Sequence, residues 1–452
     1  MLAALLFAAT AHATPYDDGV AALVARKPDA AVAAFGRCIA ETPDDVRCRW
    51  ELGWAHVLRR DWDAVIATWE DVLRRQPDHP QAADELAIAR EQLRVRDEAR
   101  AALARAKAAP PYRSRAPANA TLRLRAVGDL MIGTAFPEGA LPPDDAAGAF
   151  EGVAPALRDA DLTLGNLEGP LCDTEAVSRK CRANAAPGSC YVFRSPTRYA
   201  PLYKDAGFDV LTVANNHAND FGPACRDQTR VAITAQGIAL TGRPGSIARK
   251  TVNGLRVSVL GFHTSDTGYN LNDTDIAAAL VAGEALENDL VVVTFHGGAE
   301  GANAQHVPSA REFFKGEDRG DVRAFARAMV DAGADLIVGH GPHVLRGMES
   351  YKGRFIAYSL GNFATYGRFN LSGPQGIAGI LDVTLTRDGT WTAARMLPTV
   401  QLGEGLVTLD AEARALPLLR DLSAQDLGAD AIRVADDGRL LPPCPTRGAA
   451  CP

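Results

Sequence analysis

The chain has 452 residues, of which 47% are hydrophobic and 23% charged, and its formal net charge is −7. This composition is typical of a soluble globular protein, and the length predicts two domains. The negative charge disfavours a nucleic-acid partner, which would require a basic surface. No apolar run in the sequence reaches the length of a transmembrane helix.

Residues 1–13 predict a secretory signal peptide. The stretch "LAALLFAA" is a short apolar segment, and the "AHA" that follows fits the small-x-small pattern of a cleavage site. No basic segment precedes the apolar one, so we expect the true start codon further upstream. The alternative is the beginning of a buried helix. We favour export, with a periplasmic or extracellular location.

The eight cysteines favour an oxidising compartment. An even number in close sequence groups is typical of disulfides. The alternative, a cysteine-based zinc site, is weak because the sequence has no C-x-x-C pair. We predict two short-range disulfides, Cys38–Cys48 and Cys444–Cys451. The remaining group consists of Cys172, Cys181, Cys190 and Cys225.

Residues 15–108 predict a small all-α domain of the tetratricopeptide type. Landmark residues recur about 34 residues apart, which is the tetratricopeptide period. The recurring pairs are Gly19 and Gly53, Pro43 and Pro77, and Glu51 and Glu85. A charged helix near 82–107 would cap the repeat, whose surface is a candidate binding site for a protein partner. The alternative is a helical bundle with accidental spacing.

A Pro-rich linker, residues 109–120, precedes a region of different texture. From residue 121 to about 400, apolar strands alternate with helical stretches, which predicts βαβ units. The expected strands are 122–127, 162–166, 209–215, 255–262, 289–297 and 334–340, with a hairpin around Lys352-Gly353. Residues 401–452 form a C-terminal extension without an informative pattern.

Polar side chains follow most of the predicted strands at their carboxyl ends. They are Asp129; Asn166 and Glu168; Asn215, Asn216, His217 and Asp220; His296 and Glu300; and His340 and His343. In a parallel sheet these ends lie along one edge, so we expect the side chains to converge there. Each has an ordinary explanation when taken alone, such as a turn cap at Asp129 or a core histidine at His296. Their joint placement favours a metal or catalytic site.

The residue types indicate a divalent metal ion. Mixed Asp, Glu, Asn and His ligands suit Mn²⁺, Fe²⁺ or Zn²⁺. Two ions bridged by one carboxylate would polarise a phosphoryl or carbonyl oxygen and supply a hydroxide nucleophile. His217, beside Asn216, is placed to act as a general acid. Arg346, close to His343, would contact an anionic substrate group, and the alternative is an ordinary surface arginine.

Five motifs resemble the CapA family, which is associated with poly-γ-glutamate capsule biosynthesis. They are "GDLM", "GNLEGPL", "ANNHANDFG", "FHGGAEG" and "GHGPHVLRGMESYKGRFIAYSLGNF", and they lie between residues 121 and 390. That family resembles the calcineurin-like metallophosphoesterases. The resemblance implies an α/β fold, a sheet sandwich flanked by helices, preceded here by the small all-α domain.

The resemblance also implies roles for individual residues. The implied metal ligands are Asp129, Asn216, His296, His340 and His343, and the implied general acid is His217. Met131 stands where the superfamily has a further histidine. Asn166 aligns with the superfamily's bridging aspartate, so both Asn166 and Glu168 enter the predicted ligand set, with Glu168 as the bridge.

The sequence supports two hypotheses on function. The first is an exported, metal-dependent hydrolase with one or two divalent ions, acting on a phosphoester or on an envelope polymer such as poly-γ-glutamate. In this hypothesis Asn215, Glu300 and Arg346 would bind the substrate. The second is a non-catalytic factor that binds an anionic polymer and assists its synthesis or export.

Overall fold

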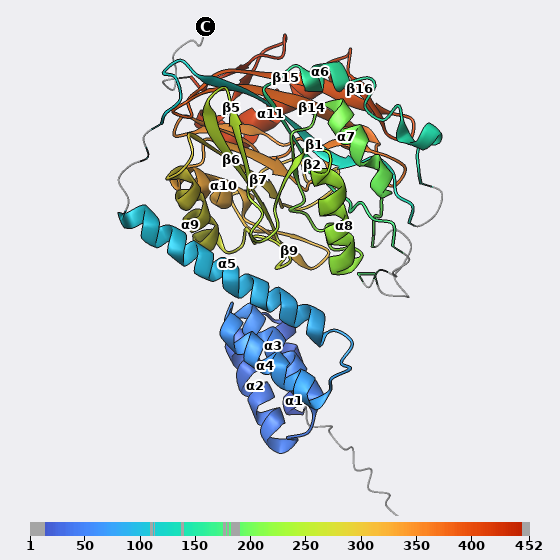
Figure 1. The fold of residues 1–452 in the computed structure, drawn as a ribbon, viewed down its shortest axis with the longest axis vertical. Helices are drawn as coiled ribbons and strands as arrows, with labels where there is room; N and C mark the ends of the chain where they lie inside the picture. The colour runs from blue at the N-terminus through green and yellow to red at the C-terminus, as the bar shows by residue number, and fades with distance from the viewer. Residues whose placement is uncertain are drawn as a thin grey trace, which may run out of the picture. The chain divides into compact units, whose positions relative to one another are not determined.

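A computed structural model describes residues 14–108, 112, 114–136, 140–174, 178, 180–181 and 190–444. The chain forms two compact units, Met1–Asp97 and Glu98–Pro452 (Figure 1). The predicted signal peptide and Cys451 of the predicted Cys444–Cys451 disulfide lie outside the described residues. Within the described ranges, no helix combines the length and the apolar composition that a membrane crossing requires.

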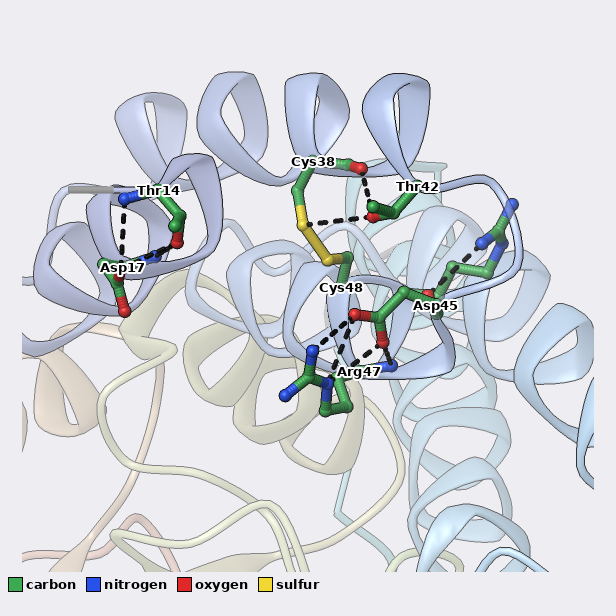
Figure 2. Close-up of a disulfide and its surroundings, with 8 residues drawn as sticks. Thr14, Asp17, Cys38, Thr42, Asp45, Arg47 and Cys48 are labelled. Carbon is green, nitrogen blue, oxygen red and sulfur yellow. Dashed lines mark hydrogen bonds and ion pairs between the residues drawn. A yellow bond between two sulfur atoms is a disulfide. The ribbon is translucent and has the colours of Figure 1, made fainter. Parts of the chain in front are cut away.

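The first unit is helical, which confirms the all-α prediction for residues 15–108. Its helices are α1 (Pro15–Val24), α2 (Pro28–Glu41), α3 (Val46–Leu58), α4 (Trp62–Arg75) and the first part of α5 (Ala82–Ala108). Polar side chains fix where helices begin, because the first backbone N–H groups of a helix have no partner within it. Figure 2 shows two such N-caps, in which Thr14 accepts from the backbone N–H of Asp17 and Asp45 from that of Arg47.

One packing contact of the first unit recurs along the chain. A side chain at Gly19 would collide with the ring of Phe35, and a side chain at Gly53 would collide with the ring of Trp69. Glycine is therefore required at both places for neighbouring helices to approach. The predicted Cys38–Cys48 disulfide is confirmed and joins α2 to α3 (Figure 2).

The second unit contains two large sheets. The first has the strand order β16 (Leu406–Leu409), β15 (Trp391–Leu402), β14 (Ile377–Thr386), β1 (Thr121–Met131), β2 (Leu162–Leu167), β3 (Val210–Thr212) and β4 (Ala239–Thr241), with β13 (Asn362–Thr365) also paired to β1. The second has the order β11 (Met348–Tyr351), β12 (Arg354–Ala357), β10 (Leu336–His340), β7 (Leu290–His296), β6 (Leu255–His263) and β5 (Ala248–Val252). Two short hairpins are formed by β8 (Glu312–Phe314) with β9 (Glu317–Gly320) and by β17 (Arg433–Val434) with β18 (Leu440–Leu441).

The two sheets pack face to face. One buried cluster contains Leu124 and Leu164 from the first sheet together with Val257, Val292 and Val338 from the second. Helices cover the outer faces (Figure 1). They are α6 (Ala154–Arg158), α7 (Ala200–Ala206) and α8 (Gly222–Thr234) beside the first sheet, α9 (Thr274–Ala285) and α10 (Val322–Asp331) beside the second, and α11 (Ala415–Leu427) near β11 and β15. The predicted sheet sandwich flanked by helices is confirmed.

We expected the polar strand ends to lie along one edge of a single parallel sheet, and this expectation is wrong. The strands β1, β2 and β3 belong to one sheet, whereas β6, β7 and β10 belong to the other. Both faces of each sheet are covered, one by the other sheet and one by helices. Strands buried on both faces read as continuous apolar runs, and such runs do not reveal how strands are distributed between sheets. The predicted hairpin around Lys352-Gly353 is confirmed as β11 and β12.

Aspartates precede four of the parallel strands and bond to the neighbouring strand. The bonds run from Arg123 N to Asp161 Oδ2 (2.8 Å), from Thr163 N to Asp209 Oδ2 (3.1 Å), from Arg256 N to Asp289 Oδ2 (2.7 Å) and from Val291 N to Asp335 Oδ2 (2.9 Å). Each carboxylate thus accepts from a backbone group beyond the regular ladder. These aspartates fix strand register at the amino ends of the strands.

Candidate metal centre

The strand pairing brings the predicted residues together in two groups. In the first sheet, Asp129 of β1 stands opposite Asn166 of β2. In the second sheet, His296 of β7 stands opposite His340 of β10. All four side chains are buried, and they lie at the carboxyl ends of their strands. The expected convergence therefore occurs, with one half of the cluster contributed by each sheet.

Asp129 is the point at which the two halves meet. Its Oδ2 lies 3.0 Å from His343 Nδ1, and its Oδ1 lies 3.5 Å from His340 Nδ1. Asn166 donates a hydrogen bond of 2.8 Å from Nδ2 to the same Oδ1. One carboxylate from the first sheet thus lies beside two imidazoles of the second half, one at the end of β10 and one in the turn that follows it.

Glu168 lies beside the histidines of the second sheet. Its Oε1 is 3.6 Å from His343 Nε2 and 3.7 Å from His296 Nε2. Asp129, Glu168 and His343 offer ligand atoms that all lie within 4.8 Å of one another, which is close enough to surround a single ion. Glu168, which we expected to bridge two ions, thus follows β2 of the first sheet and lies close to two histidines of the second half.

Several buried polar atoms of the cluster have no hydrogen-bond partner among the described residues. They are Glu168 Oε1 and Oε2, Asn216 Oδ1, His296 Nε2, and His340 Nδ1 and Nε2. Burying polar atoms without partners is costly, so native proteins rarely gather them in one place. Carboxylate oxygens, an amide oxygen and imidazole nitrogens are all donors to divalent ions of the Mn²⁺, Fe²⁺ and Zn²⁺ class. The residues present fit a metal ion.

Burial and neighbouring charges shift the pKa values of three groups in the cluster. Burial raises the pKa of the Asp129 carboxyl, but the imidazoles of His340 and His343 outweigh it and hold that pKa below its ordinary range. Burial and the charge of Asp129 raise the pKa of Glu168. Burial lowers the pKa of His343, but the charges of Glu168 and Asp129 outweigh it and raise that pKa to about 10. Opposite shifts of this kind are expected where carboxylates crowd together, and a bound cation would relieve them.

Asn166 and Asn215 orient their neighbours. Asn166 Nδ2 lies 3.3 Å from His296 Nδ1, and Asn166 Oδ1 accepts from Asn215 Nδ2 at 2.9 Å. Asn215 Oδ1 in turn accepts from the backbone N–H of His217 at 3.1 Å. The two amides connect the end of β2 to the segment after β3. Asn166 is thereby placed behind Asp129, and its predicted role as a ligand stays a prediction.

His217 has a defined orientation. Its Nδ1 lies 2.7 Å from Asp220 Oδ2, and its ring centre lies 4.2 Å from that of Phe193. Because a carboxylate only accepts hydrogen bonds, Nδ1 carries the proton and Nε2 is left for other contacts. Burial lowers the pKa of His217, against the opposing charge of Asp220. A histidine held in one tautomer beside a metal cluster is suited to proton transfer.

Glu300 lies at the edge of the cluster. Its Oε2 is 3.9 Å from His343 Nε2, and its Oε1 is 3.0 Å from Arg319 Nη1. The side chain of Glu300 is 17% exposed, whereas that of Arg319 is 0% exposed. Glu300 therefore links the buried donors to the protein surface.

Arg346 does not join the cluster. It is fully buried, and Nη1 and Nη2 donate to the two carboxylate oxygens of Glu312 at 2.8 and 2.7 Å. Nε donates to the carbonyl of Ala304, and Nη2 also contacts that of Ala299. The alternative of a surface arginine is wrong, because a buried carboxylate partner makes burial of the guanidinium affordable. Arg346 instead holds the loop that carries Glu300.

Sequence reasoning missed Asn362 and Lys180. Asn362 Oδ1 lies 3.0 Å from His343 Nδ1, and Asn362 begins β13, opposite Asp129 of β1. The signal was available, since Asn362 belongs to the "SLGNF" that follows β12 in the chain. Lys180 Nζ lies 2.8 Å from Asp220 Oδ1, but it follows no predicted strand, so the strand-end rule had no means of finding it.

The turn that presents His343 has unusual backbone geometry. His343 has a φ of 60°, and Gly341 two residues earlier has a φ of 114°. A side chain at Gly341 would meet the backbone of Gly297. The "GHGPH" sequence thus lets the turn after β10 approach the end of β7, which brings His343 toward Asp129.

Comparisons with known proteins agree with the position of this site. Residues 123–366 match the family described as "Bacterial capsule synthesis protein PGA_cap". The PGA biosynthesis protein CapA of Bacillus subtilis is 33% identical over 254 residues, which cover 52% of this chain and 61% of that protein. The capsule biosynthesis protein CapA of Bacillus anthracis is 32% identical over 289 residues, covering 57% of this chain and 63% of that protein. The matched part thus spans about three fifths of the length of these relatives.

The chain also shows similarity to a solved structure. It is the putative 5'-nucleotidase from Staphylococcus aureus in complex with alpha-ketoglutarate, which matches with a TM-score of 0.38 and 14% sequence identity. The match covers 67% of this chain and 58% of that chain.

Every residue of the buried cluster, from Asp129 to Asn362, falls inside the matched range. That range is more than half of the chain and includes most of β1 and all of β2, β7 and β10, the strands that hold the cluster. By this match the chain belongs to the PGA_cap family of bacterial capsule synthesis proteins.

Proposed function

We propose that this protein is a metal-dependent hydrolase of the metallophosphoesterase type that acts in poly-γ-glutamate capsule metabolism. The observation that carries the proposal is the group of buried donor atoms, contributed by both sheets, that have no hydrogen-bond partner within the described part of the chain. Its substrate would be a phosphoester or the anionic polymer itself. Capsule metabolism is inferred from the names of the Bacillus relatives.

The cluster would hold one or two divalent ions. Asp129, Glu168 and His343 would surround the first, with Glu168 as the bridge to a second. His296, His340 and Asn216 would complete the ligand set. When bound, such an ion polarises a phosphoryl or carbonyl oxygen and lowers the pKa of water, which makes a nucleophile at neutral pH.

The residues of the chain supply orientation and proton transfer. Asp220 fixes Nδ1–H of His217, so Nε2 would give a proton to the leaving group. Glu300, at the exposed edge, would contact the substrate. Asn215 would act through His217, since its amide already accepts the backbone N–H of that residue.

A non-catalytic role in binding poly-γ-glutamate is the second candidate. Met131 is the observation that favours it. Its buried side chain lies against Gly169, beside Glu168, where the metallophosphoesterase superfamily has a ligand histidine. A site that lacks this ligand would retain one ion, which attracts the carboxylates of a polymer without cleaving it.

Location and partners are proposed on separate grounds. The disulfides Cys38–Cys48, Cys172–Cys225 and Cys181–Cys190 support an oxidising compartment, so we keep export to the periplasm or the cell exterior. The tetratricopeptide assignment of residues 15–108 and its protein partner are likewise proposals. The same holds for the boundaries of the linker (109–120), the α/β domain (121–400) and the extension (401–452).

Metal titration followed by a substrate screen tests the proposed function. The oxidised chain, stripped with chelator, would be titrated with Mn²⁺, Fe²⁺ and Zn²⁺ by calorimetry and then assayed on phosphomonoesters, phosphodiesters and poly-γ-glutamate. We expect one or two equivalents bound and hydrolysis of one class. Binding without turnover of any substrate would support the second candidate, and no binding would refute both. His306→Ala is a matched control, because His306 is exposed and pairs with Asp426 away from the cluster.

A further inference from the structure

Lys180 contacts three successive features of the segment that follows β3. Its Nζ lies 2.9 Å from the backbone oxygen of Asn216, 3.2 Å from His217 Nδ1 and 2.8 Å from Asp220 Oδ1. Asn216 is a proposed ligand and His217 the proposed acid. Since His217 Nδ1 already carries the proton that it donates to Asp220 Oδ2, the ammonium cannot donate to it. The ammonium instead holds the other oxygen of Asp220 and so orients His217 through that carboxylate.

Phe193 contacts the same histidine from a different part of the chain. Its ring centre is 4.2 Å from that of His217, and its backbone N–H donates to Asp220 Oδ2 at 2.8 Å. Phe193 and Asp220 are both buried. The carboxylate of Asp220 therefore receives donors from Lys180, His217 and Phe193, which together satisfy both of its oxygens.

A disulfide joins the two segments that carry these contacts. Cys181 follows Lys180 directly, Cys190 precedes Phe193 by three residues, and the two cysteines are bonded with their Cα atoms 5.8 Å apart. Cys181 also packs against the apolar cluster that contains Cys172 and Cys225, and Cys225 lies in α8, the helix that begins just after Asp220. Both ends of the Cys181–Cys190 bridge are thus tied to the surroundings of His217.

We propose that Lys180 is a positioning residue for His217 and that the Cys181–Cys190 disulfide keeps it in place, so that this bridge controls turnover but not metal binding. The inference rests on the proposed function. Its physical basis is charge and entropy. Removing the cationic partner of a buried carboxylate is strongly destabilising, and a lysine side chain loses much conformational freedom when it is fixed. Linking its backbone to the Phe193 segment reduces the number of positions it would otherwise sample.

The chain contains a matched control for this bridge. Cys38–Cys48 spans a sequence separation of 10, against 9 for Cys181–Cys190, and it lies in the first unit. The test compares Cys181→Ser/Cys190→Ser with Cys38→Ser/Cys48→Ser in the full-length oxidised protein. Lys180→Met removes the charge without touching a cysteine, and Lys180→Arg restores it.

Steady-state kinetics and metal content are the first measurements. We expect kcat to fall about 10- to 100-fold in Lys180→Met and in the Cys181/Cys190 variant, the size expected for a displaced catalytic group. KM and bound metal should stay within about 2-fold of wild type, because the positioning of His217 affects only the proton-transfer step. Lys180→Arg should recover most of kcat, because it restores the positive charge. Unchanged kcat in Lys180→Met, or an equal loss in the Cys38/Cys48 control, would overturn the proposal.

Nitrogen NMR of the histidines decides the question independently of hydrolysis. With ¹⁵N-labelled histidine, His217→Gln assigns the His217 signals, which should report a proton on Nδ1 in the wild type and in the Cys38/Cys48 control. The His217 signals should change in Lys180→Met. If the Cys181/Cys190 variant does not fold, Lys180→Met alone tests the proposal. If the wild type hydrolyses nothing, only the proposed function fails. Identical His217 signals in Lys180→Met and wild type would refute the positioning role.

Discussion

Polar side chains stand at both ends of the parallel strands, and the two ends differ in whether the polar atoms have hydrogen-bond partners. At the amino end of β10, the buried carboxylate of Asp335 accepts the backbone N–H of Val291 and lies 3.4 Å from Arg354 Nη2. At the carboxyl ends of β2, β7 and β10, Glu168, His296 and His340 keep buried atoms that have no hydrogen-bond partner among the residues described. Burial alone therefore does not mark a functional side chain. The useful criterion is whether the protein itself satisfies the polar atoms that it buries.

Two buried aspartates make the contrast quantitative. Burial raises the pKa of Asp335 to about 6, although the backbone N–H of Val291 opposes the shift. Asp129 is equally buried, but its imidazole neighbours hold its pKa below the ordinary range. For Asp335 the effect of burial exceeds those of the Val291 N–H and the nearby Arg354, whereas for Asp129 the imidazoles outweigh burial. Changes at the carboxyl ends should affect metal and turnover, and changes at the amino ends should affect stability.

His343→Ala should have the largest effect. It removes a ligand atom that lies close to both Asp129 and Glu168, so hydrolysis should be abolished. Metal affinity should fall by more than the about 10- to 100-fold typical of supporting residues. At a metal concentration about 100 times the dissociation constant, wild type would gain about 2.7 kcal/mol, and the variant should lose most of this gain. Calorimetry and thermal unfolding with and without metal would measure both. Equal metal content in the variant and the wild type would show that His343 is not a ligand.

His217→Ala should separate chemistry from binding. The imidazole contacts Asp220 rather than the ligand set, so bound metal should persist while turnover falls about 10²- to 10⁴-fold. Single-turnover rates and elemental analysis on the same samples would show this. A parallel loss of metal would place His217 among the ligands and would weaken the division of roles within the cluster.

Asp335→Asn tests the amino ends through pH. The wild-type carboxyl has a folded-state pKa of about 6, above its unfolded value of 3.8. The favourable contribution of its bound proton is therefore complete below pH 3.8 and is lost as the pH rises through about 6. Asparagine keeps an oxygen for Val291 N–H without a charge. The free energy of unfolding should shift in favour of the variant by up to about 3 kcal/mol between these pH values.

Urea unfolding at a series of pH values would measure the Asp335 effect. Metal affinity should not change, because Asp335 lies at the opposite end of β10 from His340. A pH-independent difference in stability would contradict the assignment of the raised pKa to Asp335. A change in metal affinity would contradict the view that the amino ends of the strands serve stability alone.

Met131→His should have the smallest effect. It adds a nitrogen ligand beside Glu168 in place of a thioether, so we expect a few-fold gain in affinity for a second ion. Metal stoichiometry at limiting concentration is the measurement. Met131→Leu controls for the change in packing at this buried position. No gain over Met131→Leu would mean that the second ion does not use this position.

The sequence predicted the elements of the site better than their arrangement. Short apolar runs bounded by turn residues identified the strands, and the residues just after them included Asp129, Glu168, His296, His340 and His343, which do converge. The distribution of the strands between two sheets did not follow from the pattern, because it depends on which apolar faces meet.

The local sequence pattern did not predict which side chains pair with Arg346 and Lys180. Arg346 was assigned to substrate because it is near His343 in sequence, yet its guanidinium is held by Glu312, which lies 34 residues away. Lys180 reaches Asp220, the partner of His217, from a position next to Cys181, which a disulfide joins to Cys190. Both contacts are long-range, and residue type and spacing carry no information on them.

The left-handed backbone of His343 has a consequence for how this position responds to selection. A φ of 60° is strained for a residue with a side chain and relaxed for glycine. Under selection for heat resistance alone, a library randomised at this codon should accumulate glycine, whereas selection for metal-dependent activity should retain histidine. The sign of enrichment at a single codon would then report which of the two properties a given culture condition rewards.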